Sequence, residues 1–242
     1  MKNYKITIEY EGTDFCGWQI QAKSKTIQEE LQKAIKTILR EEVNLIGAGR
    51  TDSGVHALGQ TANFRYTGEI DMGKFIYSVN AILPRGIAIS RGEEVLPEFH
   101  ARFDAKKRVY LYIITNKKSP FYWKYSYFYN KEVDVRLLNE FCKEIVGKRD
   151  FRSFAKEPEE NQGTDCAIHS AHWRKTGDFT IFSIEANRFL RGMVRTIVGT
   201  LLEMERKRMN RDYLSEIIEK RERESAGMAV PPQGLFLYKV RY

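Results

Sequence analysis

Along this chain, segments with the alternating hydrophobic pattern of strands are mixed with segments that have the one-faced hydrophobic pattern of helices. No other feature of the sequence constrains its fold as strongly. Residues 4–10 alternate apolar and polar side chains, which predicts a half-buried strand. Residues 27–38 instead place their apolar side chains on one helical face, after Thr26 and Glu29 in the spacing of a capping box. Because strands and helices follow each other without strict βαβ alternation, the pattern predicts an α+β fold with a largely antiparallel mixed sheet.

The same two periods predict elements along the rest of the 242 residues. The second half repeats the mixture of predicted strands and helices seen in the first half. We therefore expect two similar α/β halves, residues 1–104 and 105–242, that meet near Asp104. No low-complexity linker separates these halves, which favours an extensive interface between them. Strands are predicted at residues 43–48, 59–66, 87–95, 109–115, 167–174, 179–185 and 235–240, and helices at 72–79, 135–146, 189–204 and 213–218.

The balance of basic and acidic residues indicates which class of molecule this chain binds. The chain has 40 Lys and Arg residues against 32 Asp and Glu residues, a formal net charge of +8. This basic excess favours a polyanionic partner, because cations that neutralise phosphates release counterions. Three cysteines, an odd count, indicate reduced thiols rather than a disulfide framework. There is no apolar signal core and no apolar run of the roughly 20 residues that a membrane span needs, so we expect a cytoplasmic protein with no membrane contact.

The glycine-rich segment 49–57 is the first candidate for chemistry. It places Asp52 on a turn between Gly49 and Gly54, with Arg50 two residues before the carboxylate. Glycine lets the backbone approach a ligand closely, so an Asp on such a turn can face a substrate. The same composition is also typical of a structural turn, in which Asp bonds its own backbone. The turn alone leaves both interpretations open.

Tyrosines beside a basic run form a second candidate. Tyr110 and Tyr112 lie two residues apart on a predicted strand, directly after the cations at 106–108. Side chains at this spacing share one face of a strand. Tyrosine on a strand packs in the sheet or, beside cations, stacks on a base.

A polar face on the helix expected after residue 187 is the third candidate. Asn187, Arg191 and Arg195 have the i, i+4, i+8 spacing that would place them on one helical face. Cations near the start of a helix oppose its dipole. An anionic partner would resolve this conflict, and Asp52 is the candidate for that partner.

Several familiar sites are disfavoured. Residues 47–52 begin like a dinucleotide-binding motif, but Asp52 replaces its third glycine and would repel a pyrophosphate. No Gly-Lys-Ser/Thr sequence exists for a phosphate-binding loop. Cys166, His169 and His172 resemble metal spacing, yet strand alternation would disperse them, so we expect no metal. Asp52 and His56 have no well-placed Ser or Cys to complete a hydrolase triad.

These segments, taken in order, resemble the TruA-type tRNA pseudouridine synthases over essentially the whole chain. The resemblance implies the pseudouridine synthase fold, with two similar halves and an active-site cleft between them. This chain departs from the family pattern at Glu11, where Asp is usual, and in strand 166–169, which lacks a familiar arginine. The matching segments are 10–21, 49–60, 108–110, 187–195 and 234–237.

The resemblance also implies an activity and site residues. It implies isomerisation of uridine to pseudouridine in the anticodon stem-loop of tRNA, at positions thirty-eight to forty, without a cofactor or a nucleotide. Asp52 would be the catalytic carboxylate and Arg195 its ion-pair partner, which keeps it ionised. Tyr110 would stack on the flipped uracil, Arg50 would replace the extruded base in the stem, and Arg191 would contact a phosphate. A symmetric homodimer that binds one tRNA across both subunits is also expected.

The main alternative is a non-catalytic RNA-binding protein. It accounts for the net charge and the tyrosines, but it gives no role to Asp52, which would repel phosphates. The sequence leaves unassigned the roles of His56, Gln60 and the acidic segment Glu157 to Glu160, the modified positions, the dimer geometry and the first chemical step at Asp52.

Overall fold

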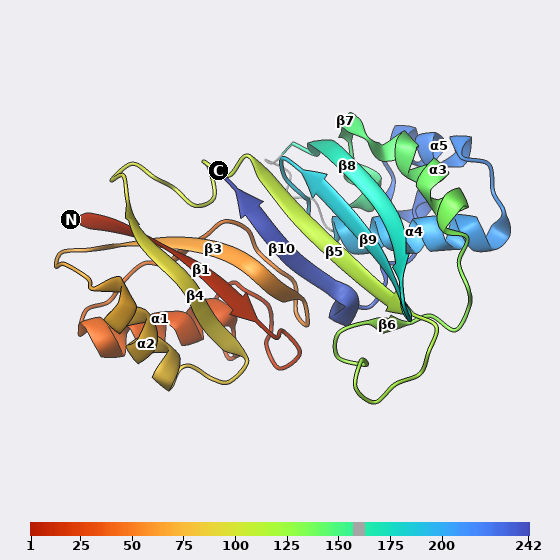
Figure 1. The fold of residues 1–242 in the computed structure, drawn as a ribbon. Coiled ribbons are helices and arrows are strands. Elements are labelled where there is room, and N and C mark those ends of the chain that lie inside the picture. The colour runs from red at the N-terminus through yellow and green to blue at the C-terminus, as the bar shows by residue number, and fades with distance from the viewer. Residues whose placement is uncertain (157–162) are drawn as a thin grey trace. The chain divides into compact units, whose positions relative to one another are not determined.

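A computed structural model describes residues 1–156 and 163–242, in two compact units (Figure 1). The first unit comprises Met1–Lys106 and Phe236–Tyr242, and the second comprises Lys107–Leu235. The C-terminal segment, placed with the second half from the sequence, therefore clusters with the first unit. The acidic segment Glu157 to Glu160 lies outside the described residues.

The sheet of the first unit has the strand order β4-β1-β3-β10, and β2 pairs with β3. All of these pairs are antiparallel except β10 with β3, which is parallel and aligns Phe236 with His56. This parallel pairing joins the C-terminal segment to the first unit. The strands are β1 (Lys2–Tyr10), β2 (Ile46–Gly47), β3 (His56–Tyr66), β4 (Ile87–Val95) and β10 (Leu235–Arg241).

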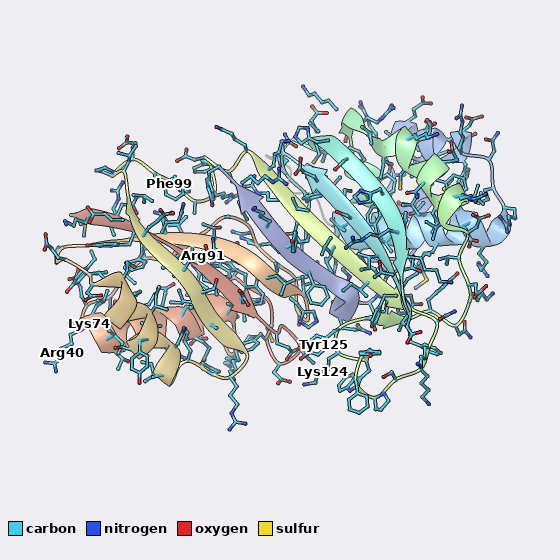
Figure 2. All side chains as sticks on the ribbon, viewed as in Figure 1. Arg40, Lys74, Arg91, Phe99, Lys124 and Tyr125 are labelled. Atoms are coloured by element: carbon cyan, nitrogen blue, oxygen red, sulfur yellow. The ribbon has the colours of Figure 1, made fainter. Side chains whose placement is uncertain are left out.

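Helices α1 (Ile27–Leu39) and α2 (Met72–Ile82) pack on one side of this sheet (Figure 1). Ile6 of β1 and Leu31 of α1 are fully buried in the core. Outside the core, Arg40 and Lys74 extend into solvent (Figure 2). The predicted apolar stripe of α1 therefore faces the core.

The capping box predicted at the start of α1 is wrong. The Thr26 side chain makes no capping hydrogen bond, and its buried hydroxyl has no partner among the described residues. Glu29 instead bonds to Lys33 one turn along, at 2.7 Å. In α2, by contrast, the Asp71 carboxylate accepts a hydrogen bond from the Lys74 N–H at 3.1 Å.

In the second unit the strand order is β5-β9-β8-β7, and β6 pairs in parallel with β5. The pairs β5–β9, β8–β9 and β7–β8 are antiparallel, which confirms the prediction of a largely antiparallel mixed sheet in an α+β fold. The strands are β5 (Lys107–Thr115), β6 (Tyr127–Phe128), β7 (Gly147–Asp150), β8 (Asp165–Thr176) and β9 (Phe179–Ala186).

Three helices lie together on one face of these strands (Figure 1). Leu138 and Ile197 contribute to the core between helices and strands and are fully buried. The helices are α3 (Val135–Ile145), α4 (Met193–Lys207) and α5 (Asp212–Lys220), and single 3-10 turns lie at Arg152–Phe154, Arg223–Ser225 and Pro232–Gly234.

Helix α4 begins four residues later than the sequence predicts. Gly192 precedes it with φ 72°, a left-handed conformation that ends the irregular segment before the helix. Before it, the Asn187 side-chain oxygen accepts hydrogen bonds from the N–H groups of Ala167 and Arg188, both at 2.8 Å. These bonds hold Asn187 in a turn. The proposed shared helical face of Asn187, Arg191 and Arg195 is therefore wrong, because Asn187 and Arg191 precede the helix.

Within the described residues, no helix combines the length and the apolar character needed to span a bilayer. All three cysteines are free thiols; Cys142 and Cys166 are buried, and Cys16 is exposed.

Candidate active site

Asp52 lies on a tight turn that connects β2 to β3 in the first unit. The Val55 N–H donates to the Asp52 carbonyl at 3.2 Å, and Gly54 has φ 75°, a conformation that favours glycine. Asp52 is half-buried, while Thr51 and Val55 on either side are buried. The local sequence thus fixes both ends of the turn that carries Asp52.

The segment that follows β1 packs directly against this turn. A Cβ atom on Gly12 would lie 2.1 Å from the Val55 carbonyl oxygen, so only glycine fits between the two backbones. The Trp18 N–H donates to the Thr51 carbonyl at 3.1 Å, and the Ser53 hydroxyl donates to the Phe15 carbonyl at 3.2 Å. The aromatic and amide-rich segment 10–21 therefore acts as a support for the Asp52 turn.

Side chains from the strands complete the support. The hydroxyls of Tyr10 and Thr51 form a buried hydrogen bond of 2.8 Å. The Gln60 amide donates to the Gly49 carbonyl at 2.8 Å, from a side chain that is fully buried on β3. Buried polar groups are expected to have such partners. Gln60 thereby receives a structural role that the sequence alone did not assign.

His56 connects the turn to the segment after β1. Its Nδ1 atom accepts the Gly12 N–H at 3.0 Å, so in this arrangement the ring carries its proton on Nε2. The ring is buried and stacks on Phe236 of β10, with 4.7 Å between centroids. Glu11, at the position where the family usually has Asp, accepts a hydrogen bond from the Thr13 N–H at 3.1 Å. His56 and Glu11 thus order the loop beside Asp52.

Arg50 is exposed, two residues before Asp52. Its Nε donates to the side-chain oxygen of Gln19 at 3.1 Å. A guanidinium oriented by an amide can leave this contact for a nucleic acid, because an exposed hydrogen bond contributes little net stability. Gln19 is a site residue that the sequence did not single out.

The second unit positions Tyr110. This residue lies on β5 opposite Ile184 of β9 and is only 9% exposed. Its ring contacts Phe189 edge to face, with 5.1 Å between centroids. One guanidinium nitrogen of Arg108 donates to the Asn187 carbonyl at 2.6 Å, so the segment before α4 lies along the start of β5. Sequence-distant residues are thus gathered around Tyr110.

Arg195 lies in the first turn of α4, and the residues of that turn include no Asp or Glu. Its Nε donates to the Val230 carbonyl at 2.7 Å, and the Val230 N–H donates to the Arg195 carbonyl at 3.2 Å. The neighbouring Pro231 carbonyl accepts the Tyr112 hydroxyl at 2.8 Å. Burial raises the pKa of Tyr112 strongly, and the positive charge of Arg195 partly opposes this. Tyr112 therefore remains a neutral hydrogen-bond donor that helps hold the Val230–Pro231 segment.

Arg191 occupies the segment between β9 and α4. It is exposed, and its carbonyl accepts the Lys156 N–H at 2.8 Å. Arg191 and Arg195 thus lie on different elements of the second unit. Asp52 and Arg50 lie on one turn of the first unit, so the predicted pairing of Asp52 with Arg195 joins residues of different units and stays a prediction.

The chemistry available at these residues is that of a carboxylate, guanidinium groups and tyrosines. No cluster of three or more His, Cys, Asp or Glu side chains suited to a metal occurs in the part of the chain that the structure describes. Cys166 is buried, whereas His169 and His172 are exposed. A single carboxylate on a supported turn suits proton transfer or attack on a sugar carbon.

Comparison with known proteins identifies the relatives of this chain. The sequence pattern of the tRNA pseudouridine synthase family matches residues 6–104 and 141–242. A protein from Parabacteroides distasonis named tRNA pseudouridine synthase A is 42% identical, covering 100% of this chain and 96% of its own length. Proteins of the same name from Bacteroides fragilis and Thermoanaerobacter sp. are 42% and 40% identical, again over 100% of this chain, and over 97% and 100% of their own lengths.

Likeness to solved structures is weaker. A chain in the crystal structure of a Cbf5-Nop10-Gar1 complex covers 82% of this chain and 53% of its own, with 11% sequence identity. The TM-score of 0.33 is too low to support a statement about fold or function.

Proposed function

Because this chain belongs to the tRNA pseudouridine synthase family and isomerises uridine to pseudouridine in tRNA, we propose that Asp52 is its catalytic carboxylate. The observation that carries the proposal is the supported turn. Backbone and side-chain contacts from segment 10–21 and from β3 hold the turn in place. A preorganised carboxylate is what a reaction at one sugar–base bond needs.

The reaction rearranges bonds within one nucleotide. The bond between C1′ of the ribose and N1 of uracil breaks, the base turns, and a bond forms between C1′ and C5. The proton on C5 is lost to solvent and N1 gains a proton, so atoms and charge balance without an external reagent. Asp52 acts on the ribose or on the ring during this sequence.

The other sequence-predicted residues complete the proposal. Tyr110 stacks on the extruded uracil, and Arg50 leaves Gln19 to take the place of that base in the stem. Arg195 is the ion-pair partner of Asp52, and Arg191 contacts a phosphate. The anticodon stem-loop is the proposed target within tRNA, and a homodimer in the cytoplasm is the proposed working form.

A tritium-release assay tests the assignment of Asp52. The substrate is a tRNA transcript that carries tritium at C5 of its uridines, so each turnover releases tritium to water. We expect Asp52→Asn to lower the rate by about a hundredfold to ten-thousandfold or more, the range for loss of a proton-transferring group. Binding of tRNA should change little, because the substitution is nearly isosteric and removes a charge that repels phosphates.

Two outcomes would contradict the proposal. Asp52→Asn protein that still turns over at the wild-type rate would remove Asp52 from the chemistry. Wild-type protein that binds tRNA but releases no tritium would favour the alternative, a non-catalytic RNA-binding protein. Arg195→Met provides a second check, because a loss confined to tRNA binding would assign Arg195 to phosphate rather than to Asp52.

A further inference from the structure

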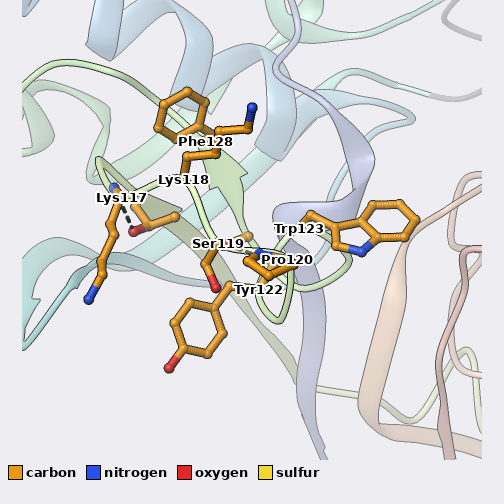
Figure 3. A pocket seen from close by; sticks show the side chains of 9 residues that line it. Lys117, Lys118, Ser119, Pro120, Tyr122, Trp123 and Phe128 are labelled. Carbon is orange, nitrogen blue, oxygen red and sulfur yellow. Dashed lines mark hydrogen bonds between the residues drawn. The ribbon is translucent and has the colours of Figure 1, made fainter.

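A pocket lies beneath the loop that connects β5 to β6 in the second unit (Figure 3). Its volume is about 430 Å³, within the range of pockets that bind small ligands. Three aromatic side chains line it, Tyr122, Trp123 and Phe128, together with Lys117 and Lys118. The loop lies in residues 105–140, between the two segments that the family sequence pattern matches.

The aromatic rings of this pocket are open to solvent. Trp123 is 59% exposed, Phe128 is 46% exposed and Tyr122 is 38% exposed. The neighbouring Phe121 is 80% exposed. Clustered exposed aromatics cost free energy in water and commonly mark a binding surface.

The loop is ordered by its own hydrogen bonds. The Tyr125 N–H and the Ser126 hydroxyl both donate to the Tyr122 carbonyl, at 2.9 Å each. The Tyr122 ring contacts Phe179 edge to face, with 4.9 Å between centroids. The Tyr129 N–H donates to the Thr115 carbonyl at 2.8 Å and closes the base of the loop. These contacts order the backbone that carries the aromatic rings, which lowers the entropy lost on binding.

The charge of the loop identifies the class of partner. Residues 116–129 contain Lys117, Lys118 and Lys124 and no Asp or Glu. The Lys124 ammonium lies 5.6 Å from the centroid of the Trp123 ring, and Lys124 and Tyr125 extend from this loop (Figure 2). Lys117 is paired with Asp178 at 3.1 Å, but both side chains are more than half exposed, so this pair is weak and screened by salt.

From these observations we propose that the pocket binds an unpaired nucleotide of RNA, with the base against Trp123 and its phosphates beside Lys118 and Lys124. Aromatic side chains stack on bases that are splayed out of a helix, and lysines neutralise the backbone beside them. The proposal rests on tRNA as the substrate and adds a contact for unpaired nucleotides outside the residues assigned to chemistry.

A second copy of the chain fits this surface less well. If this patch met the same patch of a second copy at a two-fold axis, three lysines of one copy would face three of the other. Like charges brought together across an interface are unfavourable, and the loop offers no acid to offset them. RNA supplies both the bases and the negative charge.

Tryptophan fluorescence provides a direct test. The chain has three tryptophans, and Trp18 and Trp173 are each only 2% exposed. A base that stacks on Trp123 should therefore quench the exposed component of the emission. The probe is a single-stranded oligouridylate decamer, compared with the same strand annealed to oligoadenylate. We expect quenching by the single strand, weaker quenching by the duplex, and no RNA-dependent quenching in Trp123→Phe.

Affinity for the decamer tests the two parts of the pocket separately. Trp123→Ala should weaken binding about fivefold to a hundredfold, the loss expected for one stacked base. Lys118→Gln should reduce the slope of log affinity against log salt concentration by about 0.7, the value for one phosphate contact on a single strand. Tyr77→Ala and Lys220→Gln are the matched controls, because Tyr77 is 79% exposed on α2 and Lys220 is exposed on α5.

The outcomes separate this proposal from its alternatives. If the decamer binds the wild type and Trp123→Ala equally, the pocket is not an RNA site. If Trp123→Ala instead changes the molecular mass measured by light scattering while decamer affinity is unchanged, the patch joins two copies and the proposal is overturned. Tritium release by the wild type reports independently on the proposed function, so quenching without turnover would keep the pocket and reject the enzyme.

Discussion

The position of Asp52 depends on residues that are far from it in the sequence. Tyr10 ends the first strand, Gly12 follows it and Gln60 lies on the strand after the turn, yet all three hold the turn or its flanks. The motif around Asp52 predicted a turn and a candidate carboxylate. It did not predict these supports, because hydrogen bonds between distant residues leave no local period in the sequence.

The Gly12 contact leads to a prediction about a single residue. Gly12→Ala would place a methyl group 2.1 Å from the Val55 carbonyl oxygen, so the two backbones must separate. We expect a loss of about 1–3 kcal/mol in the free energy of unfolding, typical of overpacking, and a lower rate of tritium release. Urea unfolding and the tritium assay measure the two effects.

Gly73→Ala is the control for that substitution. Its Cβ atom would lie 3.5 Å from an Asp71 oxygen, an ordinary contact, and alanine favours a helix. If Gly12→Ala and Gly73→Ala were equally stable and active, close packing at Gly12 would have no part in holding the Asp52 turn.

At the scale of elements, the hydrophobic periods predicted the type of each helix and strand better than its boundaries. The helix at 27–38 was predicted from its apolar stripe and is α1 (Ile27–Leu39). Helix α4, in contrast, begins at Met193, because Gly192 and the turn at Asn187 occupy residues that continue the apolar pattern. A helical period identifies which residues face the core and not where the backbone first becomes helical.

A substitution at the start of α1 distinguishes the capping box predicted from the sequence from the arrangement in the structure. The two predict opposite changes in the free energy of unfolding. The Thr26 hydroxyl is buried without a partner, so Thr26→Val removes an unsatisfied polar group from a site of nearly the same shape. We expect the free energy of unfolding to rise by up to about 1 kcal/mol. A functional cap would make the same substitution destabilising by about 1 kcal/mol.

Asp71→Ala is the matched measurement at α2, where the cap is present. It should lower the free energy of unfolding by about 1 kcal/mol. Chemical denaturation of both variants is sufficient, and destabilisation by Thr26→Val would show that its hydroxyl has a partner in solution.

At the scale of the whole molecule, the buried thiols link stability to pH. Burial raises the pKa of Cys142 to about 12 and that of Cys166 to about 11. A cysteine in an unfolded chain titrates near about 8.5. Between these values the folded protein keeps thiol protons that the unfolded chain has lost, so the unfolded state binds fewer protons.

The free energy of unfolding should therefore fall as pH rises from about 8.5 towards 11. The contribution is fully present below the pKa of the unfolded thiols. Urea unfolding across this window should show a smaller fall for the Cys142→Ala, Cys166→Ala double variant than for the wild type. Equal slopes would mean that the two thiols do not contribute, whereas Cys16→Ala, at an exposed thiol, serves as the control.

The sequence by itself determined the class of fold, the family, the candidate carboxylate and the residue types suited to RNA. Those features depend on local hydrophobic periods, on composition and on motifs such as the Asp52 turn. All of these can be recognised from residues that are close together in the sequence. Only the tertiary structure decided that the strand at Phe236 pairs with β3, that Gln60 supports the turn, that Val230 accepts a hydrogen bond from Arg195, and that the aromatic loop after β5 surrounds a pocket. Each of these contacts depends on which distant segments share a hydrogen-bond ladder or a packed surface. That pairing is set by the free energy of the whole folded chain and not by any local stretch of sequence.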